Sequence, residues 1–562
     1  MDISQAENAF RRRTAGGPAV LVRHDLGAHP IITHFLQRLN VEPIIRSCVG
    51  TARQGRPDHA QTTAALIHNL LVSPGPLYRI STGLKGVESS ALGMTEEEKA
   101  SLNDDRVARA LDTLASERGR GIWFRLALRV IKQFEVATDR MHFDTTSITF
   151  FGQYSQSVSD PKITPGYNKD HRPDLKQLLF GLTVAADGAV PLLHQVWSGN
   201  RTDDSVQCEN VDRLRQMLGR DDFIYVADSK LCTMDNLAHI AGYGGKFVTV
   251  MPRTRKEDRE FRNRLREKGI RWKKIHAING TAESGDIYSS CKDGGRSQDG
   301  FRIIWIRSSA KAQLDARRRE ESVTEAVREL DVLSRKLNRG QYRKRKNILR
   351  EISTILKRKG CIGFLSVKLQ RKIQVTERRL RPGRPAHSDP VHLIRQSIWH
   401  LQTARDLRVL RLERRTDGVF PLITNLQKHS KKKVLLIYKY QPYIERRFSL
   451  IKTDLGIAPI YLKKPRRVIG LIHAYFIAIA VASLLEREVR RNMAKVGIQE
   501  LCLLPEDRMT STPTAPRILE LFKNISWYEF QRGDEMIRFP IKLSILQSQL
   551  ISLLGVPKEL YS

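Results

Sequence analysis

The sequence predicts an α/β protein, in which a mixed β-sheet with flanking helices is interrupted by a large basic insertion and preceded by a helical region. Strands and helices alternate between residues 139 and 252, lysine and arginine gather in residues 253–436, and apolar residues recur at helical spacing before residue 135. The chain has 562 residues, of which 41% are hydrophobic, so we expect roughly three or four domains with real cores.

The first region, residues 1–135, is expected to be mostly helical. The segments 60–73 (AQTTAALIHNLLVS) and 105–115 (DRVARALDTLA) carry apolar residues at helical spacing, and Asp105 is a candidate N-cap. A helical region of this kind can bind DNA ends in a groove, or it can be a plain packing module. The sequence leaves both interpretations open.

Residues 136–252 are expected to form the first part of the core. The pattern predicts the order β, β, β, α, β, α, β, with strands at 141–151, twice within 175–199, at 223–230 and at 246–252, and helices at 205–219 and 234–244. Asp187-Gly188 indicates a hairpin between the second and third strands. This order gives three antiparallel strands followed by parallel ones with helical crossovers, which makes the first and fourth strands neighbours.

Residues 253–416 are assigned to the basic insertion domain. Between residues 253 and 436 the chain has 48 Lys and Arg against 20 Asp and Glu, an excess of 28 of the total net charge of +36. One strand-like run (301–307) and one long charged helical stretch (311–358) are expected there. A solvated helical hairpin normally mixes both signs, so the imbalance favours an insertion that faces DNA. Within it, Arg381 and Arg384 of RLRPGRP could lie in a minor groove or belong to a basic linker.

Composition also constrains the compartment. Six scattered cysteines without a C-x-x-C pair support neither a zinc ribbon nor a disulfide framework, which fits a reducing cytoplasm. The N-terminus has no apolar signal core. The apolar run at 468–485 is long enough to test as a membrane span, but we interpret it as a buried helix packed behind a sheet, and no membrane partner is expected.

Three acidic residues require an explanation. Asp144 lies inside the first strand, Asp228 ends the fourth, and Glu445 projects from a predicted helix (438–455) on the same face as Phe448 and Lys452. Each acid alone is explained as well by a local cap or ion pair. Three converging carboxylates, however, repel one another unless hard cations lie between them, and Mg²⁺ suits carboxylates and phosphate oxygens.

Such a cluster is typical of phosphodiester chemistry. Two Mg²⁺ ions about 4 Å apart, for which Mn²⁺ can substitute, would activate a water or a 3′-hydroxyl and stabilise the leaving oxygen. In this interpretation Asp144 bridges the ions, while Asp228 and Glu445 each hold mainly one.

The chain resembles the DDE transposases of bacterial insertion sequences, in the group with a ribonuclease H-like core, a long insertion before the catalytic Glu and a Y-R-E-K signature. The signature spacing is met by Tyr438, Gln441, Glu445 and Lys452, and the segments 166–182 and 417–425 are also similar to family features. The resemblance covers about residues 60–500. It implies that Asp144, Asp228 and Glu445 are catalytic and bind metal. It also implies that 417–495 is the second part of the core, and 496–562 a C-terminal region for oligomerisation or DNA contact.

The sequence departs from the signature at Gln441, where the family has Arg. Gln441 stays a candidate DNA contact without that charge, and Arg446 or Arg447 could replace the missing phosphate contact. Tyr438 and Lys452 are further candidate DNA contacts, although Lys452 could be an ordinary surface lysine. Pro442 is tolerated only in a first helical turn, so Tyr438 should precede the helix.

Lesser candidates have simpler explanations. Asn200 and Asp203 could form a loop near the catalytic edge, but a turn with a helix N-cap explains them better. Trp272 and Trp305 could hold a flipped base, but core packing explains them better, and His142 is interpreted as structural.

The sequence therefore predicts a metal-dependent transposase in the bacterial cytoplasm, associated with the nucleoid. It would bind terminal inverted repeats as a dimer or larger assembly, hydrolyse the 3′ ends and join them to target DNA. Two alternatives stay open: a nuclease of the same fold, and a DNA-binding protein derived from a transposase without catalysis.

Overall fold

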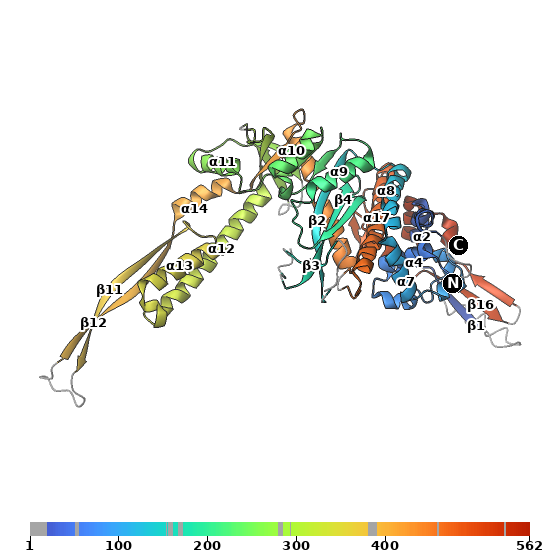
Figure 1. The fold of residues 1–562 in the computed structure, drawn as a ribbon, viewed down its shortest axis with the longest axis horizontal. Helices are drawn as coiled ribbons and strands as arrows, with labels where there is room; N and C mark the ends of the chain where they lie inside the picture. Colours follow the sequence, from blue (N-terminus) through green and yellow to red (C-terminus); the bar gives the residue numbers. More distant parts are fainter. Residues whose placement is uncertain are drawn as a thin grey trace. The chain divides into compact units, whose positions relative to one another are not determined.

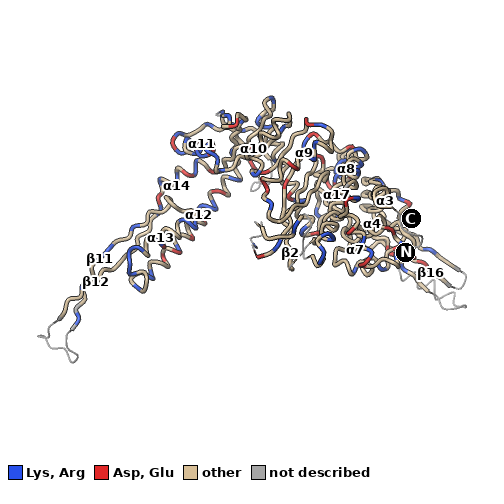
Figure 2. The backbone as a smooth tube through the Cα atoms, in the orientation of Figure 1, with Lys and Arg blue, Asp and Glu red and all other residues tan. Residues whose placement is uncertain are grey.

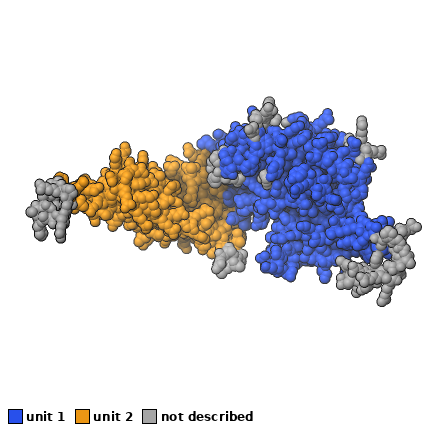
Figure 3. Space-filling view, turned by 90° about the horizontal axis from the view of Figure 1, so that it is seen from below, with its two compact units in different colours: residues 1–249, 436–562 blue, residues 250–435 orange. Residues whose placement is uncertain are grey.

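The computed structural model describes residues 20–50, 56–152, 154, 161–166, 172, 174–278, 285–292, 294–379, 391–457, 460–532 and 535–561. It is a mixed α/β protein that divides into two compact units (Figure 3). Unit 1 contains residues 1–249 and 436–562, and unit 2 contains residues 250–435. The ribbon is shown in Figure 1.

Unit 1 begins with the expected helical region. Its longer helices are α2 (His29–Arg38), α3 (Val41–Val49), α4 (His59–Val72), α7 (Asp104–Leu114) and α8 (Arg120–Phe134). The two helices predicted at 60–73 and 105–115 are confirmed as α4 and α7. The N-cap of α7 is Asn103, whose side chain accepts from the Arg106 N–H, so the prediction of Asp105 as the cap was wrong; Asp105 lies in the first turn instead.

The sheet of unit 1 has the predicted strand order. Its strands are β2 (Arg140–Phe150), β4 (Lys176–Ala185), β5 (Pro191–Ser198), β6 (Ile224–Val226) and β7 (Lys246–Val250), with the short β3 (Thr164–Pro165) beside β4. β2 pairs antiparallel with β4, and β4 with β5, whereas β6 is parallel to both β2 and β7. The predicted contact between the first and fourth strands is confirmed as the β2–β6 pair.

The predicted connections between these strands are also present. The β4–β5 turn contains Asp187 and Gly188, and a φ of 79° at Gly188 gives the left-handed backbone that glycine adopts readily. The crossovers to β6 and β7 run through α9 (Gln207–Leu218) and α10 (Met234–Gly242).

The long apolar helix α17 (Pro465–Val496) belongs to the interior of unit 1. It packs against α4, α7 and β5, and Figure 1 shows it beside α8. By length and composition this helix could cross a membrane, but 89% of its most apolar 18-residue window is buried inside the protein. The burial agrees with the interpretation of this segment as a core helix.

The N- and C-terminal segments of unit 1 share structure that the sequence did not indicate. β1 (Val20–Asp25), β16 (Ser526–Arg532) and β17 (Glu535–Phe539) form one antiparallel sheet. The C-terminal segment also contains β14 (Leu501–Leu504), β15 (Arg508–Thr510), α18 (Ala515–Glu520) and α19 (Ile545–Leu554). The Tyr561 hydroxyl donates to the Gly27 carbonyl at 2.9 Å, which ties the two ends together.

Unit 2 combines a small sheet, a helical hairpin and a long two-stranded ribbon. The elements are α11 (Lys256–Glu267), β8 (Lys273–Ile278), β9 (Asp286–Ser290), β10 (Arg302–Ser308), α12 (Ser309–Lys336), α13 (Arg345–Arg358), β11 (Leu365–Arg379), β12 (Val391–Arg405), α14 (Leu407–Glu413) and β13 (Val419–Thr424). The strand predicted at 301–307 is confirmed as β10. The helical stretch predicted at 311–358 is two helices, α12 and α13, with a break between Lys336 and Arg345.

The helical hairpin of unit 2 has a core of its own. Val323, Ala326, Leu330 and Ile352 are buried with Leu365 at the start of the ribbon, and Trp399 and Leu401 of β12 pack against them. The insertion is therefore a folded domain rather than a solvated hairpin alone.

Candidate active site

Asp144 lies in β2 at the edge of the core. Its strand neighbours Phe143 and Thr145 are buried, while Asp144 itself is half-buried. Its Oδ1 accepts from the Thr145 N–H at 2.8 Å. The strand therefore fixes the backbone of Asp144 and leaves part of the carboxylate accessible.

Asp228 follows the neighbouring strand at the same level. The last parallel pair of the β2–β6 register joins His142 to Val226, and Asp144 and Asp228 each lie two residues beyond it. Asp228 is half-buried and its Oδ1 accepts from the Lys230 N–H at 3.0 Å. The Thr249 hydroxyl on β7 donates to the Asp228 carbonyl at 2.6 Å. Because adjacent strands are about 4.8 Å apart, this register places the two acids side by side, Asp144 within β2 and Asp228 just past the carboxyl end of β6.

Glu445 comes from α16 (Pro442–Ser449), in which it is exposed in the first turn. Pro442 opens this helix and Tyr438 is the last residue of α15 (Lys431–Tyr438), so the prediction that Tyr438 precedes the helix is confirmed. The chain after Ser449 changes to a π-helical turn (Leu450–Asp454). Lys452 was expected on the same helical face as Glu445. Because of the π-helical turn, the half-buried Lys452 does not continue that regular face.

Gln441 attaches the start of α16 to β2, next to Asp144. Its Nε2 donates to the Phe143 carbonyl at 3.0 Å, and its Oε1 lies 2.9 Å from Nδ1 of His142. Burial lowers the pKa of His142 to about 4, so the imidazole is neutral at pH 7 and its Nδ1–H donates to Gln441. The expectation that Gln441 contacts DNA does not agree with this geometry, because the side chain is buried and both of its ends are used inside the protein.

Arg447 attaches the other side of α16 to the β4–β5 turn and to α17. It donates to the carbonyls of Ala189 and Gly188 at 3.0 and 2.8 Å, and to Oε2 of Glu486 at 2.8 Å. Only 5% of the Arg447 side chain and 7% of the Glu486 side chain are exposed. The expectation that Arg447 contacts DNA is therefore not supported: its donors are directed into the protein core.

The pKa of the Tyr438 phenol is affected by burial and by the negative charge of all three carboxylates. Burial is the main reason that its pKa is raised, and the negative charges of Asp228, Glu445 and Asp144 raise it further. Tyr225, fully buried on β6, also has a raised pKa, chiefly from burial, with added contributions from Cys208, Asp228 and Asp144. Because three acids from β2, β6 and α16 act on one hydroxyl, they occupy one neighbourhood of unit 1.

The donor types around this point are those that hard divalent cations prefer, since all three are carboxylates. Within the described residues, however, no group of three or more His, Cys, Asp or Glu side chains is close enough to hold one ion. The residue types thus fit Mg²⁺ or Mn²⁺, while the ligand set is not assembled in this conformation.

A fourth acid, Asp203, lies beside the first. Its Oδ1 accepts from the Thr145 hydroxyl at 2.7 Å, and Thr145 directly follows Asp144. Asp203 was expected to cap a helix, but the N-cap of α9 is Val206, so that part of the interpretation was wrong. The only sequence signal that Asp203 lies near Asp144 was its position directly after the strand pair at 175–199. Asn200 is exposed in the same turn.

The other sequence candidates differ in their surroundings. Arg446 is exposed, with its guanidinium 4.9 Å from the Tyr443 ring. Trp305 is buried and stacks on Phe261 with ring centroids 3.7 Å apart, which confirms core packing; Trp272 meets the same ring edge-on at 6.4 Å. Arg381 and Arg384 lie outside the described residues.

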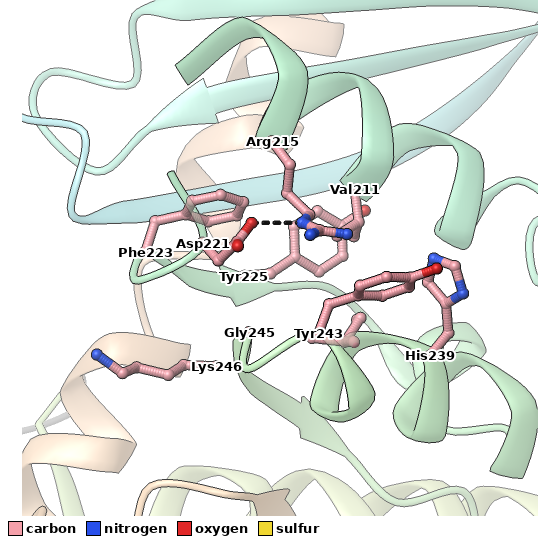
Figure 4. Close-up of a pocket in the computed structure, with 10 residues that line it drawn as sticks. Val211, Arg215, Asp221, Phe223, Tyr225, His239, Tyr243, Gly245 and Lys246 are labelled. Atoms are coloured by element: carbon pink, nitrogen blue, oxygen red, sulfur yellow. Dashed lines mark hydrogen bonds and ion pairs between the residues drawn. The ribbon is translucent and has the colours of Figure 1, made fainter. Parts of the chain in front are cut away.

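A surface pocket of unit 1 lies at the opposite end of the same strands (Figure 4). It is lined by Asp221 and Phe223 before β6, by Gly245 before β7 and by Lys246 at the start of β7. Its main cation, Arg215, is paired with Asp221. This pocket is at the amino ends of β6 and β7, whereas Asp228 follows the carboxyl end of β6 and Asp144 lies beside it in β2, so the pocket is not part of the carboxylate site.

Comparisons with known proteins give limited information. Residues 22–128 match the model of a domain of unknown function, DUF4277. No curated protein matches the chain. The chain is similar to a solved piggyBac transposase synaptic complex with hairpin DNA, with 8% identity and a TM-score of 0.38 over 88% of this chain and 78% of that chain. A likeness at this level does not assign a function, so the function must be inferred from the carboxylate site.

Proposed function

We propose that the protein is a metal-dependent DNA transposase whose active site consists of Asp144, Asp228 and Glu445. The observation that carries this proposal is geometric: Asp144 and Asp228 lie at matching positions of adjacent parallel strands, and Gln441, four residues before Glu445, is hydrogen-bonded to Phe143 and His142 beside Asp144. Acids that served only as local caps would have no reason to converge from segments 84 and 217 residues apart.

The strand order supports a ribonuclease H-like core in unit 1. Three antiparallel strands are followed by two parallel strands in the spatial order β5-β4-β2-β6-β7. The acids lie on the central strand β2, on the adjacent β6 and on a helix near them. This is the arrangement that the resemblance to DDE transposases of bacterial insertion sequences implies.

Asp144, Asp228 and Glu445 would hold two Mg²⁺ ions, or Mn²⁺ in their place. When bound, the ions would activate a water or a 3′-hydroxyl for in-line attack and stabilise the oxygen that leaves. Gln441 and Arg447 orient α16, and with it Glu445, against β2 and the β4–β5 turn. Movement of the exposed Glu445 side chain toward Asp144 and Asp228 would complete the ligand set when metal and DNA bind.

The proposed partner is double-stranded DNA, as terminal inverted repeats and as target. The excess of 28 positive charges between residues 253 and 436 supports a polyanion. Near the carboxylates, the side chains of Tyr438, Arg446 and Lys452 are the candidates for phosphate contacts. A homodimer or larger assembly on the DNA and a bacterial cytoplasmic location follow from the resemblance.

One reaction separates this function from its alternatives. Duplexes that carry the DNA flanking the gene would be incubated with the full chain and Mg²⁺, and the products separated on a denaturing gel. Joined strands support a transposase, and cut ends without joining support a nuclease. A stable complex that neither cuts nor joins overturns the enzyme. It would favour a DNA-binding protein, for which the unassembled ligand set is the specific supporting observation.

Lys452→Ala is expected to weaken the complex with end DNA by about 10-fold, the effect of losing one phosphate contact, while Mn²⁺ binding to the protein stays unchanged. Fluorescence anisotropy with end duplexes, run beside Mn²⁺ titration, measures both quantities. Lys463, exposed beyond the π-helical turn, provides the matched control substitution. Equal affinities for wild type and Lys452→Ala would show that Lys452 is an ordinary surface residue.

A further inference from the structure

The ribbon of β11 and β12 in unit 2 has two faces of different chemistry. Each strand has 15 residues, and the antiparallel register runs without a break from Leu365↔Arg405 to Arg379↔Val391. Side chains alternate between the two sides of a strand, so odd-numbered residues share one face and even-numbered residues the other. Figure 1 shows the ribbon as the longest pair of strands in unit 2.

At the base of the ribbon, the odd-numbered face packs against the helical hairpin of unit 2. Val367, Leu369 and Leu401 are partly buried against the core that α12 and α13 share. Trp399 joins them, and its indole N–H donates to the Arg343 carbonyl at 3.0 Å. The helical hairpin therefore supports the ribbon from this side.

The even-numbered face, which we call the polar face, is exposed along β11 from residue 366 to residue 378, and on β12 only Ile394 and Ile398 among its even-numbered described residues are partly buried. Its exposed side chains include three cations and four amides: Lys368, Lys372, Arg378, Gln370, Gln374, Gln396 and Gln402. Within 365–379 and 391–405, none of the even-numbered positions is an aspartate or a glutamate. Figure 2 shows lysine and arginine along both strands.

These features match one class of partner. The DNA major groove is about 12 Å wide and admits a two-stranded β-ribbon, and glutamine and lysine or arginine are the side chains that pair with adenine and guanine edges. At about 3.3 Å per residue, a 15-residue strand is about 50 Å long, enough to follow a groove. A second copy of the chain would bring a face of the same positive charge, and an apolar partner would find few apolar side chains here.

We propose that the polar face binds double-stranded DNA in the major groove. Lys368, Lys372 and Arg378 contact phosphates, and Gln370, Gln374 and Gln402 reach the base edges. The identity of the partner as DNA rests on the proposed function, but this binding does not use the carboxylates. It is therefore expected even if Asp144, Asp228 and Glu445 prove inactive.

The phosphate contacts are tested with the full chain in EDTA, with a random-sequence duplex as the probe. The variant Lys368→Ala/Lys372→Ala/Arg378→Ala should bind at least about 10-fold more weakly at about 0.15 M salt, and the slope of log affinity against log salt should fall by about 3. The control, Lys523→Ala/Lys542→Ala/Lys558→Ala, removes the same charge from exposed positions of unit 1 and should keep the wild-type slope.

The base contacts are tested by selecting preferred duplexes from a random library with the wild-type chain. In Gln370→Ala/Gln374→Ala/Gln402→Ala, affinity for the selected duplex should fall at least about 10-fold toward that for random duplex, with the salt slope unchanged. The minor-groove ligand netropsin should not compete with wild-type binding.

Three outcomes would overturn the proposal. The charge variant and its control could lose affinity equally, which would indicate net charge alone. Both variants could bind like wild type. The charge variant could lose affinity only together with a change of oligomeric state in light scattering, which would assign the polar face to a second copy of the chain. Circular dichroism of each variant confirms that it is folded.

Discussion

Asp144→Asn, Asp228→Asn and Glu445→Gln are each expected to lower the rate of DNA cleavage by at least about 10³-fold and to leave end binding nearly intact. A loss of this size corresponds to about 4 kcal/mol of transition-state stabilisation, which is the scale of losing a ligand to a catalytic metal. Single-turnover cleavage of end duplexes in Mg²⁺ measures the rate, and anisotropy in EDTA measures binding.

The three substitutions should not disturb the fold. In Asp144→Asn the new side chain would still accept from the Thr145 N–H through its Oδ1, as Asp144 does at 2.8 Å, and asparagine is as good a cap as aspartate for the turn at Lys230. Glu445 is exposed. Asp222→Asn is the matched control, because this exposed acid lies before β6 whereas Asp228 lies after it. Full activity of any of the three variants would remove that residue from the site.

Arg447→Ala is expected to destabilise the protein by about 3–5 kcal/mol. The substitution leaves the buried Glu486 carboxylate without this partner and the carbonyls of Gly188 and Ala189 without their donor. The thermal unfolding midpoint should fall by about 5 °C or more. Cleavage should fall as well, because α16 loses its attachment to the β4–β5 turn.

The adjacent Arg446→Ala provides the matched control for Arg447. Arg446 is exposed, so its removal should change the free energy of unfolding by no more than about 0.5 kcal/mol. Lys in place of Arg447 should recover only part of the stability, since one ammonium cannot reproduce the planar guanidinium that reaches three acceptors. Equal midpoints for Arg446→Ala and Arg447→Ala would contradict the structural role given to Arg447.

The sequence was sufficient for the core because its signals there are local. Runs of β-branched, aromatic and other apolar residues predicted β2 and β4, Asp187-Gly188 predicted the hairpin that joins β4 to β5, and the order of elements then placed β6 beside β2. The positions of Asp144 and Asp228 at one edge followed from that order. Glu445 could be placed near them only through its spacing from Tyr438 and Lys452.

The misassigned residues show what local patterns miss. Arg446 and Arg447 are the same residue type, so only their positions around the helix distinguish them. Arg447 lies three residues after the buried Ile444 and next to the buried Phe448, which places it on the interior face. Phase was thus a usable signal that Arg447 faces the interior. The attachment of Gln441 to His142 had no such signal, because the two residues are 299 positions apart.

For a similar reason, the sequence did not predict the strands β1, β11, β12 and β16. The ribbon β11–β12 carries polar residues on its free face, so it lacks the apolar runs that mark a buried strand. β1 pairs with β16 across about 500 residues of sequence, and nothing near Val20 or Arg532 indicates the partner. Long-range pairing of this kind depends on the tertiary fold rather than on local propensity.

The proposed transposase requires Asp144, Asp228 and Glu445 to close around one metal site. Iron-directed cleavage tests it directly: Fe²⁺ replaces Mg²⁺ in the protein bound to DNA, ascorbate and peroxide generate radicals at the ion, and mass spectrometry locates the breaks in the chain. The proposed site predicts breaks near residues 144, 228 and 445 together, all suppressed by excess Mg²⁺ and by Asp144→Asn. Breaks near only one of the three, or breaks that persist in Asp144→Asn, would contradict a shared metal site.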